Sequence, residues 1–192
     1  MRQLVFLLEG PSERDAIEAW LPKLLPAGVE AHFIVFDGKQ DMERRMALKL
    51  RRWLRPDSRF IVLRDQDSAD CRAVKASLQA RCVEAGRAHE CLVRVACHEL
   101  ENFFLGDWQA VAQAFNQPRL AELDRKAVYR EPDHIALPAA ELRRHLPGYQ
   151  KREGARRIAP CMNLARNRSL SLAHLRDAIV RQASAPATTE QV

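Results

Sequence analysis

Two aspartates, Asp65 and Asp67, follow an apolar run at residues 60–63 and are separated by a single residue. In an extended chain, side chains two residues apart point to the same side, so the two carboxylates can converge where a strand ends. Close carboxylates repel each other unless a hard divalent cation such as Mg²⁺ lies between them, so one interpretation is a metal site. The other interpretation is a turn, in which Asp or Ser68 caps a helix that begins near Ala69.

Further acidic residues stand at the ends of the other apolar runs. They are Glu9 and Glu13 after residues 4–8, Asp37 after residues 32–36, and Glu99 and Glu101 after residues 91–97. Each acid alone is explained as a cap, a turn residue or a favourable charge at a helix start. Because the carboxyl ends of parallel strands lie along one edge of a sheet, however, we expect these acids to cluster.

Apolar runs alternate with segments of helical periodicity, which predicts βαβ units and an α/β fold. The fold expected is Rossmann-like, with a central, mostly parallel, four-stranded sheet flanked by helices and right-handed crossovers. The strands are expected at residues 4–8, 32–36, 59–63 and 91–97, and helices at about 12–24, 41–54 and 69–85. Ser12 and Asp15 resemble a capping box for the first helix, and Pro22 predicts a kink or restart within it.

The pattern changes after Asp107. A short helix is expected at residues 108–115, a proline-containing looped excursion at 116–148, a basic turn at 149–152, and helices at 155–164 and 170–182. The small, polar residues beyond them predict a disordered tail. The expected organisation is therefore an α/β core at 1–107, a helical and looped extension packed on it at 108–182, and a tail at 183–192.

Positive charge is concentrated in one part of the chain. The net charge is +6, and residues 143–168 alone carry a net +7, so the remainder sums to −1. A basic segment beside an acidic centre suits a polyanionic substrate, and the phosphate contacts expected from it are Arg152, Arg156, Arg157 and Arg168. The alternative is a solvated basic helix.

Other features of the composition narrow the class of protein. The five cysteines form no Cys-x-x-Cys pair, so we expect reduced thiols rather than disulfides or zinc ligands. No apolar stretch reaches the length of a membrane span, and residues 2–8 lack the pattern of a signal peptide. These features predict a cytoplasmic protein that does not enter the membrane.

Three acidic motifs occur in a fixed order along the chain. They are Leu-Leu-Glu-Gly-Pro-Ser-Glu at 7–13, Asp-Gln-Asp-Ser at 65–68 and Glu-Leu-Glu at 99–101. This set resembles the Toprim fold, the catalytic domain of topoisomerases and primases. More narrowly, it resembles the Toprim half of the overcoming-lysogenization-defect (OLD) nucleases and the small family DUF4276, over residues 3–107 and more loosely from Lys151 to Ser169.

The resemblance implies a site that binds one or two Mg²⁺ or Mn²⁺ ions and hydrolyses nucleic-acid phosphodiesters. The implied metal ligands are Glu9, Glu13, Asp65, Asp67 and Glu101. Glu9, Asp65 and Asp67 are also expected to be catalytic, together with Lys151, which would neutralise charge on the phosphate. Glu99, Ser68 and Asp37 are expected as accessory residues.

The resemblance also implies partners. The nucleases carry an ATPase domain, whereas this chain has no Gly-x-x-x-x-Gly-Lys-Ser/Thr loop, so a separate ATPase is expected, in a phage-defence type of system. DNA is the substrate expected first, with structured RNA as an alternative, and a homodimer is possible.

Two further functions stay open. The first is a non-catalytic effector subunit of an ATPase complex. The second is a nucleotide-binding phosphotransferase, although such enzymes usually place Asp-x-Asp after the first strand, and here it follows the third.

Overall fold

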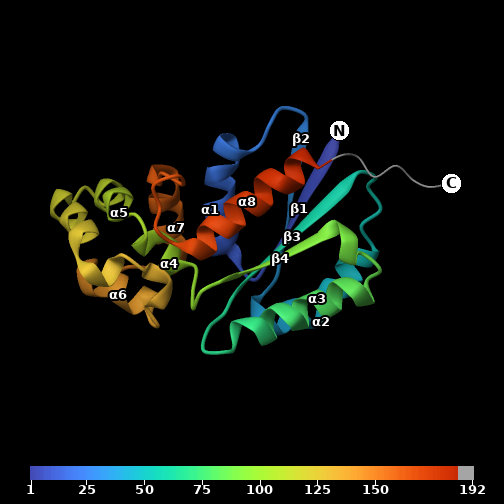
Figure 1. Ribbon diagram of the computed structural model, residues 1–192, viewed down its shortest axis with the longest axis horizontal. Coiled ribbons are helices and arrows are strands. Elements are labelled where there is room, and N and C mark those ends of the chain that lie inside the picture. Colours follow the sequence, from blue (N-terminus) through green and yellow to red (C-terminus); the bar gives the residue numbers. More distant parts are fainter. Residues whose placement is uncertain (186–192) are drawn as a thin grey trace.

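A single parallel sheet lies at the centre of the computed structural model, which describes residues 1–185 (Figure 1). Its strand order is β2-β1-β3-β4, and every neighbouring pair is parallel. The strands are β1 (Arg2–Leu8), β2 (Val29–Val35), β3 (Ser58–Asp65) and β4 (Cys91–Ala96). The predicted α/β class and four-stranded sheet are confirmed, and the sheet is parallel throughout rather than mostly parallel.

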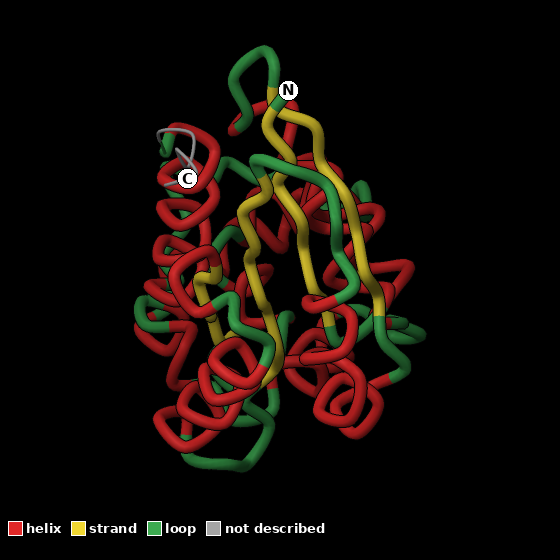
Figure 2. Tube along the Cα trace, turned by 90° about the vertical axis from the view of Figure 1, so that its right-hand side faces the viewer, coloured by secondary structure: helices red, strands yellow, loops and turns green. Residues whose placement is uncertain are grey.

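Helices cover both faces of this sheet. They include α1 (Pro11–Leu24), α2 (Gly38–Arg51), α3 (Cys71–Glu84) and α8 (Leu170–Ser184). Side chains of β1 alternate between the faces, so that Leu4 and Phe6 pack in the core that holds α1 and α8, whereas Val5 and Leu7 pack in the core that holds α2 and α3. Figure 2 shows the strands running between these helical layers.

The second strand differs most from its predicted bounds. It begins at Val29 and ends at Val35, whereas the apolar pattern predicted residues 32–36. The reason is its position: β2 lies at the edge of the sheet and none of its residues is fully buried, so its apolar signal is weak.

The first helix differs in two details from the prediction. It begins at Pro11 with Gly10 as N-cap, and within the described chain the cap makes no side-chain hydrogen bond, so the capping box of Ser12 and Asp15 does not form. The helix also continues through Pro22 to Leu24. Proline lacks a backbone N–H donor and normally disrupts the interior of a helix. Pro22 lies in the last turn, so little of the helix follows it.

The segment after Asp107 is more helical than predicted. Its helices are α5 (Trp108–Ala114), α6 (Pro138–His145) and α7 (Lys151–Ile158), and α4 (Glu101–Leu105) precedes them. The predicted looped excursion contains 3₁₀ turns at Pro118–Arg125, Ala127–Tyr129 and Pro132–His134. The predicted helix at 155–164 is found in part, as α7 followed by a 3₁₀ turn at Ala159–Cys161, and it begins earlier than predicted, at Lys151, within the predicted basic turn at 149–152.

This extension shares one hydrophobic core with the sheet. Tyr129, Leu142 and Tyr149 belong to the same buried cluster as Leu4 and Phe6 of β1. The last helix reaches Ser184, so the predicted start of the tail at Ala183 was too early, and residues 186–192 lie outside the described part. No helix among the described residues is long and apolar enough to cross a membrane.

The shared core predicts that α8 stabilises the whole chain. Leu175 is fully buried, so Leu175→Ala should lower the free energy of unfolding by roughly 2–5 kcal/mol. Urea unfolding followed by tryptophan fluorescence and by circular dichroism should give one coincident transition. The control is Leu170→Ala on the same helix, where the side chain is 70% exposed and the change should stay within about 0.5 kcal/mol. Separate transitions for the two probes would contradict the shared core.

Candidate acidic centre at the carboxyl edge of the sheet

The strand order places the carboxyl ends of β1 and β3 side by side at a switch in chain direction. From β1 the chain passes to β2 on one side, and β3 then pairs with β1 on the other side. Leu8 lies beside Val35 and Leu63, and Asp65 lies beside Ala96, so the strands end at similar levels. Ligands of open α/β sheets bind at such switch points, outside the carboxyl ends of the strands.

Four acids and one lysine gather there, and we call them the acidic centre. They are Glu9, Glu13, Asp65, Glu101 and Lys151. The predicted clustering of acids from the loops after β1, β3 and β4 is therefore found, although the chain reaches this edge from five separate segments.

Asp65 is the most strongly perturbed member of the acidic centre. It is the last residue of β3 and is only 7% exposed. Burial raises its pKa well above the usual range, and the nearby charges of Glu13 and Glu101 raise it further, while Lys151 acts in the opposite direction. Burial without a fully compensating cation is thus the main electrostatic feature of this position.

Glu13 enters the acidic centre from the first turn of α1. Its side chain is buried, and burial together with the charges of Glu9 and Glu101 raises its pKa to about 7. Gly10 helps to accommodate it, because a Cβ atom at Gly10 would lie 3.2 Å from Oε2 of Glu13. Glu13 is therefore a buried acid that changes charge near neutral pH.

Glu99 and Glu101, which the sequence could not rank, occupy different environments. Glu101 is 1% exposed, and burial raises its pKa, with Lys151 opposing that shift. Glu99 is more exposed and accepts hydrogen bonds from Lys151 Nζ at 2.9 Å and from the backbone N–H of Ala139 at 3.1 Å. Glu101 thus faces the other buried acids and Lys151, whereas Glu99 hydrogen-bonds Lys151 at a more exposed position. The division into ligand and accessory residue stays a prediction.

Lys151 reaches the acidic centre from the N-terminus of α7. Its Nζ lies 2.9 Å from Oε1 of Glu99 and 3.5 Å from Oε2 of Glu101. Burial lowers its pKa, but the charges of Glu101, Glu99 and Asp65 outweigh burial, so the pKa lies above the usual value. The ammonium group is accordingly charged throughout the neutral pH range.

Tyr149 is a member of the site that the sequence did not reveal. Its buried hydroxyl donates a hydrogen bond to Oε1 of Glu101 at 3.2 Å. Its ring packs directly on Gly154, where an added Cβ would lie 2.2 Å from the ring. A glycine inside a helical run signals a close approach of this kind, and that signal could have found it.

The chain leaves the extended conformation after Asp65, so Asp67 does not continue the strand. Asp67 has a φ of 56°, and its backbone N–H donates to the carbonyl of His98 at 2.7 Å. Its side chain accepts from Lys39 Nζ at 2.9 Å and interacts electrostatically with Glu9. The same-side geometry expected for residues 65 and 67 therefore does not apply, since it requires both to be extended.

Glu9 is held by a buried cation, Arg64. Arg64 is buried within β3, 3.6 Å from the Glu9 carboxylate and 2.6 Å from that of Glu43. Burial and the charge of Asp67 raise the pKa of Glu9, and Arg64 lowers it. An arginine at the end of an apolar strand needs a buried partner, and that signal could have pointed to it.

The accessory residues Asp37 and Ser68 are exposed. Asp37 is the N-cap of α2 but, within residues 1–185, its side chain makes no capping hydrogen bond. Ser68 lies in the turn before α3, and α3 is capped by Asp70, which accepts from the N–H of Ala73 at 2.8 Å. The helix-cap interpretation of Asp65, Asp67 and Ser68 is therefore wrong, because Asp70 performs that role.

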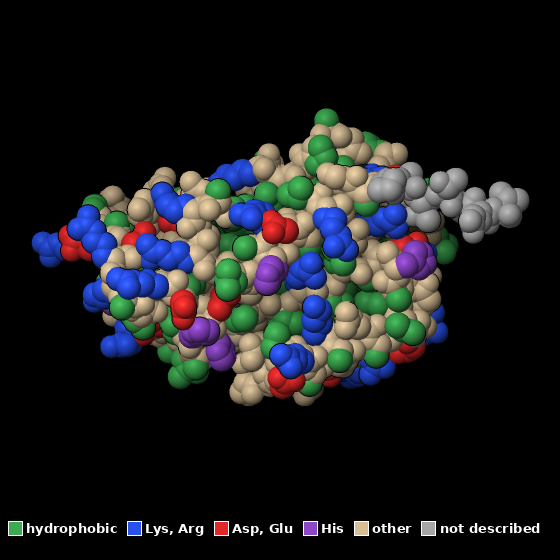
Figure 3. Space-filling view, in the orientation of Figure 1, with side chains coloured by type: hydrophobic (Ala, Val, Ile, Leu, Met, Phe, Trp, Pro, Cys, Tyr) green, Lys and Arg blue, Asp and Glu red, His purple; other side chains and the backbone are tan. Residues whose placement is uncertain are grey.

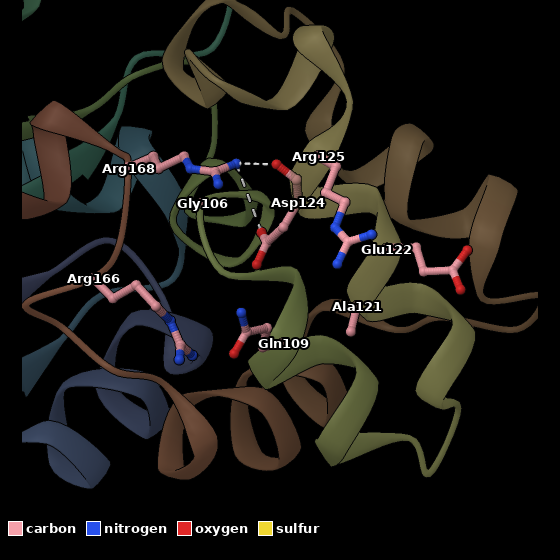
Figure 4. A pocket seen from close by; sticks show the side chains of 8 residues that line it. All are labelled: Gly106, Gln109, Ala121, Glu122, Asp124, Arg125, Arg166 and Arg168. Carbon is pink, nitrogen blue, oxygen red and sulfur yellow. Dashed lines mark hydrogen bonds and ion pairs between the residues drawn. The ribbon is translucent and has the colours of Figure 1, made fainter.

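The four arginines expected to contact phosphates make contacts within the chain. Arg152 and Arg156 both donate to Asp15 of α1, at 2.9 and 2.8 Å. Arg157 donates to the carbonyl of Ala114. Figure 4 shows Arg168 turned toward Asp124, whose carbonyl and carboxylate it contacts. A count of charges could not reveal these pairings, since their partners are distant in sequence.

The oxygen atoms of the acidic centre suit a hard divalent cation. Buried Glu9 Oε2, Asp65 Oδ1 and Glu101 Oε2 make no hydrogen bond within the described chain, which is unusual for buried polar atoms. Carboxylate oxygens are the donors that Mg²⁺ and Mn²⁺ prefer. As the side chains stand, however, no three acidic, histidine or cysteine residues among residues 1–185 are close enough to hold one ion. The types of donor fit, and the side chains would have to move together to complete a site.

The raised pKa of Glu13 predicts a pH dependence of stability. Between about pH 4.5, its ordinary pKa, and about pH 7, its pKa in the fold, the unfolded chain loses the proton and the folded chain keeps it. Stability should therefore fall as the pH rises through this window and stay lower above it, by on the order of 2 kcal/mol. Denaturant unfolding in EDTA from pH 4.5 to 8 should show that Glu13→Gln lacks this component.

The matched control is Glu18→Gln on the same helix, where the side chain is 56% exposed and the pH profile should follow that of the wild type. Parallel profiles for Glu13→Gln and the wild type would show that Glu13 is not a buried, titrating acid.

Comparison with curated proteins gave no match, and comparison with solved structures gave none either. Residues 8–179 match the family described as "Domain of unknown function (DUF4276)". This match spans most of the chain and includes the acidic centre, which confirms the predicted membership: the chain belongs to the DUF4276 family.

Proposed function

We propose that the acidic centre binds one or two Mg²⁺ or Mn²⁺ ions and that the protein hydrolyses nucleic-acid phosphodiesters, with DNA as the first substrate to test. The protein would work with a separate ATPase in a defence-type system. The observation that carries the proposal is the group of buried carboxylate oxygens, on Glu9, Asp65 and Glu101, that make no hydrogen bond in residues 1–185 and lie at the switch point of the sheet.

The resemblance to Toprim nucleases supports the same interpretation. Its motif residues Glu9, Glu13, Asp65 and Glu101 are contributed by four segments of the chain, and they interact electrostatically with one another. Lys151, matched to the late lysine of those nucleases, lies beside them. Parallel topology brings the ends of β1, β3 and β4 to one edge, and the motif adds that the side chains placed there are acids.

The residues of the centre have distinct roles in this proposal. Divalent ions held by the carboxylates would activate water and stabilise the leaving oxygen. Lys151 places a permanent positive charge beside Glu101, where it would stabilise charge that develops on phosphate oxygens. Tyr149 orients Glu101 by its hydrogen bond to Oε1, which leaves Oε2 available. Arg64 lies 3.6 Å from Oε2 of Glu9 and would hold that carboxylate by charge.

A second function, a non-catalytic effector subunit of an ATPase complex, is favoured by a specific observation. Lys151 contacts Glu99 and Glu101, Lys39 contacts Asp67, and Arg64 contacts Glu9, so the chain already supplies cations to most of its acids. A subunit that only binds a partner protein and does not cleave nucleic acid needs no metal ion beyond these cations. Structured RNA is the alternative substrate for the catalytic function.

Metal binding is tested first by thermal unfolding. Mn²⁺ or Mg²⁺ at millimolar concentration should raise the melting temperature of the wild type, because binding to the folded state alone stabilises it. Asp65→Asn should abolish this rise and should be at least as stable as the wild type in EDTA, since it removes a buried charge. The control Asp177→Asn, at a side chain that is 64% exposed, should keep the full rise. A wild type that is insensitive to both ions would exclude the metal site.

Hydrolysis is tested with purified protein, labelled single-stranded and duplex DNA and RNA, and Mg²⁺ or Mn²⁺. The assay is run with and without any ATPase encoded beside the gene. Lys151→Ala should reduce turnover by about 100-fold or more with little change in substrate affinity, as expected for a charge that acts in the transition state. Lys126→Ala, at an exposed lysine of the extension, is the control and should cleave like the wild type. Metal binding without cleavage under any of these conditions would favour the effector subunit.

A further inference from the structure

A groove of about 530 Å³ runs beside β4, the strand at one edge of the sheet. Its walls come from β4, from α3, from the start of α8 and from the 3₁₀ turn at Pro132–His134. The side chains that matter for its chemistry are Lys75, Arg94, His134 and His174. It is distinct from the cavity of Figure 4, where Arg166 pairs with Asp107 and Arg168 with Asp124.

The groove is positively charged. Lys75 is exposed, and among the described residues no ion pair is formed by it. Arg94 interacts electrostatically with one cation, Arg181, and with one acid, Asp177, which is itself paired with Arg176. The acid in the wall, Asp133, is occupied by hydrogen bonds from Ser169 and Ser171 at 2.7 to 3.1 Å. Figure 3 shows Lys, Arg and His side chains gathered on this face, over β4 and between α3 and α8.

The edge of β4 is poorly suited to pairing with another strand. The carbonyl of Val93 accepts a hydrogen bond from Arg94, and the carbonyl of Glu90, just before the strand, accepts one from Gln182. Side chains therefore occupy backbone acceptors that an added peptide strand or a second copy of the chain would need. A ligand in the groove must therefore be bound by side chains of the protein, namely its cations and imidazole rings.

The chain that lines the groove continues into the loop that carries Glu99 and Glu101. Cys97 lines the groove, and Glu99, two residues further along the chain, binds Lys151. The loops after β3 and β4 are joined where the N–H of Asp67 donates to the carbonyl of His98. A polyanion lying along β4 would therefore lie beside the loop from which Glu99 and Glu101 extend.

We infer that this groove binds the backbone of single-stranded nucleic acid, with phosphates on Lys75 and Arg94 and bases against the rings of His134 and His174. Positive grooves with stackable rings are the usual way in which proteins hold single strands. Cleavage of the bound strand rests on the proposed function, whereas binding itself needs no metal. We place the groove ahead of the basic segment 143–168 as a substrate surface, because Arg152, Arg156 and Arg168 are paired with carboxylates within the chain. Arg94, in contrast, donates to the carbonyls of Val93 and His174 and keeps its charge.

The test is fluorescence anisotropy of a labelled oligothymidylate with the full chain in EDTA, as a function of salt. Lys75→Glu should weaken binding about tenfold at low salt and reduce the slope of log affinity against log salt by at least about one. The matched control is Lys49→Glu, the same charge change at an exposed lysine on α2, beside a different basic groove, and its binding should stay within about twofold of wild type. His174→Ala should weaken binding without changing the slope.

Two results would overturn the inference. In the first, Lys75→Glu binds like the wild type, or Lys49→Glu loses as much affinity, so that the groove has no special role. In the second, an acidic peptide displaces the oligonucleotide at equal charge concentration, so that the groove takes a protein partner. If Lys75-dependent binding holds while the metal assays fail, the groove stands and the proposed hydrolysis does not, so the two proposals fail separately.

Discussion

The burial of like charges around Lys151 is the constraint on which the rest of this site depends. Asp65, Glu13 and Glu101 are each almost completely enclosed, and burial raises the pKa of all three. Such a cluster opposes folding unless cations compensate for it. Lys151 supplies part of that compensation from the N-terminus of α7, and the carboxylate oxygens that make no hydrogen bond in residues 1–185 leave room for more.

The extension at residues 108–182, which carries Lys151, is packed tightly against the sheet and its helices. The indole N–H of Trp20 in α1 donates to the carbonyl of Ala159 just after α7, and Arg152 and Arg156 both bind Asp15 of α1. These contacts hold α7 against α1, the helix that follows β1. The apolar cluster continues from β1 through Tyr149 to α8. Packing of the extension thus positions the lysine, and the lysine in turn compensates the acids of the sheet.

The net charge of a segment does not show how strongly it attracts a polyanion, because ion pairs within the chain compensate part of that charge. The segment with the highest positive charge contains the arginines that fasten α7 and the loop near Asp124, so its charge is largely structural. The groove beside β4 carries fewer cations, yet Lys75 and Arg94 lie there next to the loop of the acidic centre. A polyanion is attracted by local potential, which depends on which cations remain uncompensated.

The sequence by itself determined the strands, the parallel α/β class and the order of the acidic motifs, because buried parallel strands leave continuous apolar runs and their carboxyl ends share one edge. It also pointed to Lys151. It could not predict that the chain turns after Asp65 so that Asp67 faces Lys39, nor that Asp70 caps α3. Tyr149 at Glu101, Arg64 at Glu9 and the arginines at Asp15 were decided by tertiary structure alone, because each contact joins residues far apart in the chain.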